Sequence, residues 1–303
     1  MVISGRVLHG GPDGRPLARA WVVLHRVRMG GGGGPLDSTR TDTRGGFTLT
    51  AMRPDTDAIY VVSSWYDGIA YFSEPVPAGR PARELHPLLV YDTTTAGPDV
   101  QVARRLLTIA QPKKDGTRDA LELVELRNPG TKTRIARDTL RPAWAGAIPR
   151  DAIQFQAGQG DVSAEAVTRR GDSVAVFGPI PPGESKQLTY TYVLPGSVTR
   201  LVVPIDQPTA ELDLLVEDTA ATVTAPRLDS LRVEQLEGRR FARYRVRTAP
   251  AGASVTVAFP ASRGVRAESL VPIVAILAAI ALGAGFVWAL RRKTSDVRQQ
   301  TSG

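Results

Sequence analysis

Short runs in which apolar residues stand together or alternate with polar ones recur along the first third of the chain. Clusters of Gly, Pro and Asp separate these runs, as in "GGPDGRP", "TDTRGG" and "RPDTD", and such clusters favour turns. Apolar residues with helical spacing are almost absent before the C-terminal region. The pattern predicts a β-sandwich with a flexible loop at 30–34 and with strands at 2–8, 20–27, 47–50, 58–64, 69–72 and 88–91.

From about residue 102 the pattern changes but still predicts β-strands. "ALELVELRNPGTKT" joins an alternating strand to an Asn-Pro-Gly turn, and "DSVAVFGPIPPGESKQLTYTYVLPG" predicts two strands around a Pro-Gly turn. We therefore expect tandem β-sandwich modules. The first covers 1–95, and the second covers 102–197 with an immunoglobulin-like or fibronectin-like layout. Residues 198–260 form either a third small module or a continuation of the second, and a short linker at 93–101 separates the first two modules.

The C-terminal region carries a different pattern, because residues 270–290 contain no charged side chain. A helix of this length extends about 31 Å, which matches a hydrocarbon core of about 30 Å. Trp288 precedes the basic cluster of Arg291, Arg292 and Lys293 by one helical turn. Aromatic side chains favour the membrane interface, and basic clusters favour the cytoplasmic side. The sequence predicts one transmembrane helix at 270–290, a basic cytoplasmic tail at 291–303, and an extracytoplasmic location, periplasmic or cell-surface, for the large part.

The start of the chain conflicts with that topology. "MVISGRVLHG" has neither a basic segment nor an apolar segment of the kind found in signal peptides. Either the true start lies upstream, or the tail inserts the protein while the large part stays in the cytosol. We favour the first alternative because the large part has the pattern of extracellular β modules.

Three small residues, Ala275, Ala279 and Gly283, recur at every fourth position within the apolar segment. In a helix they lie along one face, where they allow the backbone of another helix to approach closely. This strip predicts association through the transmembrane helix, with a second copy or with a membrane complex. The alternative is that the strip only reflects an alanine-rich composition.

Charge and cysteine content narrow the function classes. The 303 residues carry a net charge of +8, but the basic residues are scattered among acidic ones, whereas nucleic-acid binding requires clustered basic residues with interleaved aromatics. We expect a membrane association and no nucleic-acid partner. The chain contains no cysteine, and this does not decide the compartment.

The first third resembles a known family. "ISGRVLHGGPDGRPLARAWVVLHRV", "DSTRTDTRGGFTLT" and "YVVSSWYDGIAYFSEPV" are similar to the carboxypeptidase regulatory-like domain, a transthyretin-like (prealbumin-like) sandwich common in bacterial surface proteins. The resemblance covers residues 2 to about 95. It implies the sandwich fold and a role as a rigid module, docking surface or spacer, and it implies no chemistry.

Motifs for catalysis or metal binding are absent from the sequence. The histidines are His9, His25 and His86, and none belongs to a zinc-binding spacing such as H-E-x-x-H. No G-x-S-x-G motif supports a serine nucleophile. We therefore expect no catalytic residue, no cofactor and no metal. Three acidic residues near loops could bind calcium weakly, although turn formation explains each of them as well: Asp37, Asp42 and Asp55.

These observations predict a non-catalytic, membrane-anchored β protein that binds or positions a partner, as an accessory or scaffold subunit. One alternative is a surface adhesion or carbohydrate-binding protein in which Trp65, Tyr66 and Tyr71 form a stacking platform, although strand core explains these three residues equally well. A remote alternative is a hydrolase with an unrecognised site.

Overall fold

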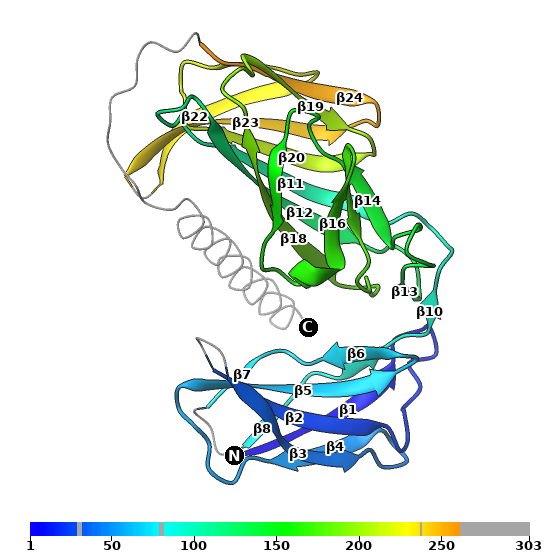
Figure 1. Ribbon diagram of the computed structural model, residues 1–303. Helices are drawn as coiled ribbons and strands as arrows, with labels where there is room; N and C mark the ends of the chain where they lie inside the picture. Colours follow the sequence, from blue (N-terminus) through cyan, green and yellow to red (C-terminus); the bar gives the residue numbers. More distant parts are fainter. Residues whose placement is uncertain (29–31, 79–81, 237, 261–303) are drawn as a thin grey trace, which may run out of the picture. The chain divides into compact units, whose positions relative to one another are not determined.

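The computed structural model describes residues 1–28, 32–78, 82–236 and 238–260. In these residues the regular structure consists of β-strands and one 3₁₀ turn at Ala164–Ala166, so the all-β prediction is confirmed. The chain divides into two compact units (Figure 1). The first unit combines Met1–Gln101, Arg127–Trp144 and Val176–Lys186, and the described part of the second runs through Val102–Leu126, Ala145–Ala175 and 187–260.

The first unit contains two main sheets. One has the order β4-β1-β8, with β9 also paired to β1, and the other has the order β3-β2-β5-β6, with β7 paired to β5. The strands of the first sheet are β1 (Val2–His9), β4 (Gly46–Thr50), β8 (Ala82–Glu84) and β9 (Leu88–Val90). The strands of the second are β2 (Trp21–Arg28), β3 (Gly33–Arg40), β5 (Ala58–Tyr66), β6 (Ile69–Phe72) and β7 (Val76–Pro77).

Each run predicted as a strand in this unit overlaps an observed strand, but three strands of the two main sheets were not predicted: β3, β7 and β8. β3 begins at Gly33, inside the segment predicted to be a loop. It is an edge strand that pairs antiparallel with β2, from Gly33 opposite Val27 to Arg40 opposite Trp21. Its glycines and Pro35 hide the usual strand pattern, because pairing along one side of an edge strand does not require an apolar alternation.

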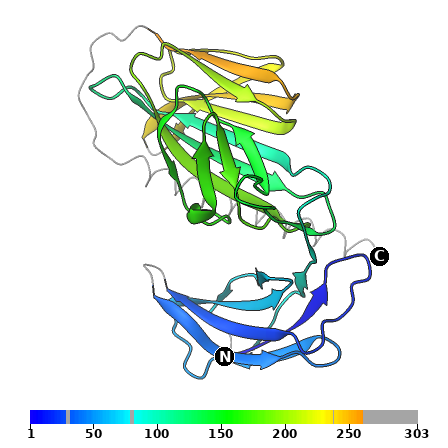
Figure 2. The same cartoon turned by 45° about the vertical axis from the view of Figure 1, so that its right-hand side comes forward.

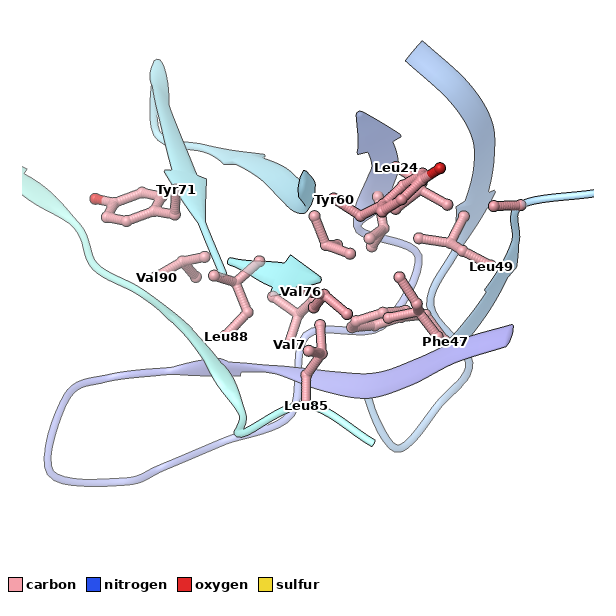
Figure 3. Packing of buried hydrophobic residues seen from close by; sticks show 14 of the residues in the cluster. Val7, Leu24, Phe47, Leu49, Tyr60, Tyr71, Val76, Leu85, Leu88 and Val90 are labelled. Carbon is pink, nitrogen blue, oxygen red and sulfur yellow. The ribbon is translucent and has the colours of Figure 1, made fainter. Parts of the chain in front are cut away.

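Apolar side chains from both sheets meet in the core of the first unit (Figure 3). Phe47 and Leu49 of β4 lie on one face of the strand, as their spacing predicts, and both are buried. They pack with Leu24 of β2 and Tyr60 of β5 in the same cluster. Alternation along the strands therefore directs one face of each sheet into this core and leaves the opposite face outside it.

Residues 93–101, predicted to be a linker, are fastened to the first unit by later parts of the chain. β10 (Thr93–Thr94) pairs in parallel with β13 (Thr133–Arg134). The Arg134 guanidinium donates hydrogen bonds to the carbonyls of Thr95, Gly97 and Pro98, at 3.2, 2.8 and 2.6 Å. These contacts hold residues 93–98 in a defined conformation.

The second unit is built on a seven-stranded sheet with the order β15-β18-β12-β11-β20-β23-β22. Two three-stranded sheets, β14-β17-β16 and β19-β24-β21, accompany it (Figure 2). Strands from 102–197 and from 198–260 share the large sheet. Its strands are β11 (Gln101–Ile109), β12 (Arg118–Arg127), β15 (Ile153–Ala157), β18 (Ser185–Leu194), β20 (Thr209–Val216), β22 (Leu228–Leu236) and β23 (Arg239–Ala249). The smaller sheets contain β14 (Trp144–Ala147), β16 (Val167–Arg170), β17 (Ser173–Val176), β19 (Arg200–Ile205), β21 (Thr222–Thr224) and β24 (Ala253–Ala258).

The predicted transmembrane helix at 270–290 lies outside the described residues. Within the described ranges, no helix has the length and apolar character needed to cross a bilayer.

Candidate interaction surface

The side of the β3-β2-β5-β6 sheet that faces away from the core is the candidate site. Leu24 and Tyr60 point into the core, so the alternate positions of β2 and β5 point outward. The register then places the outward residues of all four strands, together with β7, on one surface, which we call the outer face. Its members are Trp21, Val23, His25, Val27, Gly33, Pro35, Ser38, Arg40, Ile59, Val61, Ser63, Trp65, Ala70, Phe72 and Pro77.

The outer face is apolar where a solvated sheet is normally polar. Trp65 and Phe72 are each 60% exposed and Trp21 is 45% exposed. None of the outer-face residues is acidic, and Arg40 is the member with a permanent charge. Its guanidinium carbon lies 5.3 Å from the centre of the Trp21 ring, within range of a cation–π contact. A contiguous apolar surface of this kind marks an interaction site more often than isolated exposed side chains do.

The outer face has an order along the strands. One end carries Trp21 and Trp65, with Arg40 opposite Trp21 and Ala70 opposite Trp65. The other end carries Val27 opposite both Gly33 and Ile59, and Ile59 opposite Pro77. Between them are two mixed rows, Ser38–Val23–Ser63–Phe72 and Pro35–His25–Val61. Bulky aromatic groups therefore stand at one end and small aliphatic groups at the other.

His25 and Ser63 form a hydrogen-bonded pair in the middle of this surface, with 2.8 Å between the imidazole Nε2 and the hydroxyl Oγ. A serine hydrogen-bonded to a histidine supplies two members of a nucleophilic triad. The triad also needs a third group that orients the histidine. The outer face supplies no carboxylate for that role. Ser63 is 2% exposed, so the histidine gives a partner to a hydroxyl that is shielded from water.

The proposed stacking platform of Trp65, Tyr66 and Tyr71 does not form on one face. Tyr71 is buried in the core, and its hydroxyl bonds to the Tyr91 carbonyl at 2.7 Å and to the Thr133 hydroxyl at 2.8 Å. The Tyr66 hydroxyl donates to Asp92, away from Trp65. Trp65 is instead joined on the outer face by Trp21 and Phe72. The missing information was the pairing register, since alternation fixes the side of each residue but not its neighbours on other strands.

A polar cluster surrounds Asp92 in the first unit. Its carboxylate accepts hydrogen bonds from Tyr66 at 3.0 Å and from His9 Nε2 at 3.2 Å, and Lys132 lies 3.6 Å away. The Nδ1 atom of His9 accepts the Gly11 amide at 3.2 Å. These hydrogen bonds, Tyr66 first and His9 second, lower the pKa of Asp92. Both ring nitrogens of His9 are used in holding the chain, which gives this cluster a structural role.

The acidic residues considered for calcium each cap backbone groups. Asp42 accepts the amides of Arg44 and Gly46, both at 2.8 Å, and the hydrogen bond from Gly46 is the larger cause of its lowered pKa. Asp55 bonds Arg28, which is the main cause of its lowered pKa, and Asp37 accepts the amides of Ser38 and Thr50. Among the described residues, no group of three or more His, Cys, Asp or Glu side chains is arranged to hold a metal. The remaining histidine, His86, is exposed and lies 3.3 Å from Glu74.

The second unit contains a buried ionic network that alternation alone does not predict. Arg105 donates to Glu122 at 2.6 Å, and Glu122 also accepts hydrogen bonds from Tyr190 at 3.0 Å and from Tyr192 at 2.9 Å. Arg105 further donates to the carbonyls of Pro204 on β19 and Ala147 on β14. The network joins strands of all three sheets of this unit.

Its ionisation follows from burial and charge. Burial alone would lower the pKa of Arg105, but the adjacent Glu122 carboxylate more than offsets that effect and the pKa lies above its ordinary value. Burial first, and the Glu122 charge second, raise the pKa values of Tyr190 and Tyr192 well above the usual range. Each charge is compensated inside the fold, so removing one partner would leave a buried charge uncompensated and would be costly, and the network is not open to a ligand.

The predicted helix-packing and topology residues lie outside the described residues: Ala275, Ala279, Gly283, Trp288, Arg291, Arg292 and Lys293.

Comparisons with known proteins add little. No family model matches the chain, and no curated protein matches it. Among solved structures, part of the chain is similar to a 9R-lipoxygenase from Cyanothece PCC8801, with 14% identity and a TM-score of 0.23. That similarity covers 30% of this chain and 17% of the lipoxygenase. A similarity this weak carries no argument about function.

Proposed function

We propose that this chain is a non-catalytic, membrane-anchored β protein that binds a protein partner through the outer face. The observation that carries the proposal is the apolar surface formed by Trp21, Val27, Ile59, Trp65 and Phe72, on an outer face that includes Arg40 but no acidic residue. Aromatic residues are enriched in the buried centres of protein interfaces, and charged residues are depleted there. The first unit then acts as a rigid docking module, in keeping with its resemblance to carboxypeptidase regulatory-like domains.

The anchor in this proposal is the apolar segment at 270–290, with Arg291, Arg292 and Lys293 on the cytoplasmic side. The two β units then lie on the extracytoplasmic side, next to the membrane proteins that such an accessory or scaffold subunit would serve. Neither a cofactor nor a metal takes part. Packing of Ala275, Ala279 and Gly283 against a neighbouring helix would hold the partner at a second point.

Site-specific photocrosslinking of the full chain tests the proposal. A photoreactive phenylalanine analogue replaces Phe72 on the outer face, and a control chain carries it at Thr48, an exposed residue of β4 on the other sheet. We expect protein adducts from position 72 that position 48 does not give. Equal labelling from the two positions, or no protein adduct from either, would overturn the proposal.

A second candidate function is saccharide binding, which is favoured by one observation. Trp21, Trp65 and Phe72 are exposed on the same side of one sheet, and aromatic rings in such a position can stack on sugar rings. The aliphatic end of the outer face, with Val27 and Ile59, favours protein instead. Retention of the full chain on an insoluble polysaccharide, lost in Trp65→Ala, would support the saccharide function.

A further inference from the structure

We infer that docking on the outer face depends on pH and that His25 is the residue that sets this dependence. The partner binds while the imidazole is neutral and is released when acid protonates it. The inference rests on the proposed function, namely that this surface binds protein, and it adds the regulation of that site.

His25 lies in the interior of the outer face. The register places Pro35 of β3 on one side of it and Val61 of β5 on the other. Val23 and Val27 precede and follow it on the same side of β2. A partner that covers these apolar residues therefore also covers the imidazole, which is partly buried in the chain by itself.

The charged residues of β2 and β3 do not compensate a charge on His25. Arg26 and Arg28 alternate with it along β2 and point to the other side of the sheet, where Arg28 pairs with Asp55 at 2.8 Å. The carboxylate of Asp37 accepts two backbone amides, one on β3 and one on β4. Arg40 stands opposite Trp21, about 13 Å along the strands, and has the same sign as a protonated histidine.

The other strands of this sheet add no charge either. β5, β6 and β7 contain no acidic and no basic residue. Their tyrosines stand at the positions that alternate with Trp65 and Phe72, so they point to the other side of the sheet. The described strands that surround His25 on the outer face therefore offer no carboxylate to a protonated imidazole.

The two protonation states of His25 differ in the cost of being covered. The neutral ring shares a hydrogen bond of 2.8 Å with Ser63 through Nε2, so this polar pair stays satisfied when water is removed. The protonated ring carries a full charge, and burying a charge without a partner of opposite sign costs far more than burying a paired polar group. The docked state therefore favours the neutral ring.

The sign of the pH dependence follows. A histidine side chain changes its charge between pH 5 and 8, and the protonated form dominates on the acid side. The apparent affinity of the outer face falls in proportion to the fraction of chains with a neutral ring. In the proposed extracytoplasmic location the outer face meets the pH outside the cytoplasm, and acid there releases the partner.

Photocrosslinking from position 72 of the full chain in its membrane measures the effect when it is carried out at both ends of the histidine range, pH 8 and pH 5. We expect the protein adducts to fall by about ten-fold or more from the higher to the lower pH, because the binding-competent fraction becomes small. Circular dichroism of the detergent-solubilised chain at both pH values checks that the sheet spectrum is kept.

Two neutral replacements, His25→Gln and His25→Asn, remove the titration. The readout is the ratio of adducts at the two pH values within each variant, so an effect of the substitution on the affinity itself cancels. We expect a ratio close to one in both. His86→Gln is the matched control, because His86 is an exposed histidine outside this sheet, and it should keep the full decrease.

His25→Arg places a permanent positive charge at the same position. At the higher pH this variant should give about ten-fold fewer adducts than the unsubstituted chain, as acid does, because a covered charge without a partner opposes docking. Adducts at the level of the unsubstituted chain would contradict the role of charge at this position.

The outcomes separate this inference from the proposed function. Adducts that do not decrease at the lower pH, or a decrease that persists in both neutral variants, overturn the inference and leave the proposed function in place. Loss of the adducts at both pH values in the two neutral variants would assign the imidazole to a direct contact, and it also overturns the inference. Absence of adducts from the unsubstituted chain at either pH overturns both proposals.

Discussion

Glu122 illustrates how one residue can take a role that its local sequence hides. The charge of this residue in "ALELVELR" favours a solvent-facing position, yet Glu122 is fully buried. The strand alternation places it inward with Val124 and Leu126. Its burial is made tolerable by Arg105 and by two tyrosines that lie far away in the sequence, so no local pattern predicts the network.

Tyr192→Phe tests this network. Removing one donor from the Glu122 carboxylate should lower the free energy of unfolding by about 1.5–3 kcal/mol, the range for hydrogen bonds to charged groups. Chemical denaturation followed by circular dichroism measures the loss. A change near zero would contradict the role assigned to the hydroxyl.

Alkaline titration gives the matching pH dependence. The folded-state pKa values of Tyr190 and Tyr192 lie above the unfolded value of about 10. Their contribution to stability is thus complete below pH 10 and is lost as the pH rises further, because the unfolded chain releases these protons more readily. Phenolate absorbance from the two residues should appear together with unfolding, and Tyr192→Phe should reduce that component. Reversible ionisation of both near pH 10 with the sheet spectrum intact would contradict this.

At the scale of elements, the turn before β4 depends on a glycine for two separate reasons. Gly45 has a φ of +75°, and a Cβ there would lie 2.5 Å from the Val7 carbonyl oxygen. Gly14 also has a positive φ, +53°, but has open space around it. Comparing the two positions separates backbone strain from close approach.

Gly45→Ala should destabilise the first unit by about 1–3 kcal/mol, whereas Gly14→Ala should cost only the left-handed conformation, about 1 kcal/mol. Denaturation midpoints of the two variants measure the difference. Equal midpoints would show that β1 moves aside to admit the methyl group.

Strand positions were predictable because alternation with period two is a local property of the sequence. Trp21, Val23, His25 and Val27 could be assigned to one side of their strand in the same way. Their neighbours on the other strands could not be predicted. Trp65 lies near them only because β5 pairs with β2, and Phe72 only because β6 pairs with β5, and such register is set by contacts between distant segments. The sequence therefore indicated which residues of β2, β5 and β6 share a side of their strand, but it indicated neither the contribution of β3 and β7 nor which residues are neighbours on the outer face.

For the whole molecule, the testable prediction is topology. With the C-terminus tagged, protease added to intact spheroplasts should digest the two β units and spare the tag, because Arg291, Arg292 and Lys293 favour the cytoplasmic side. Replacing these three with Ala should weaken that orientation. Protection of the β units with loss of the tag would reverse the assignment.

The division into units was not predictable from composition. Two-residue strands such as β10 and β13 carry too little pattern to be recognised, yet their pairing assigns Arg127–Trp144 to the first unit. The segment Val176–Lys186 returns to the same unit, and Ile180 bonds Arg134 through both backbone groups.

This return of the chain has a consequence for biosynthesis. A ribosome delivers residues in order, so the two sheets of the first unit are complete once residue 101 has emerged. The partners that hold residues 93–98 arrive only with Thr133 and Arg134, and Ile180, which pairs with Arg134 through an isolated β-bridge, arrives later still. Until then the end of the nascent sandwich is unfinished, and a chain stalled or cut before residue 180 exposes backbone groups that the full-length protein covers.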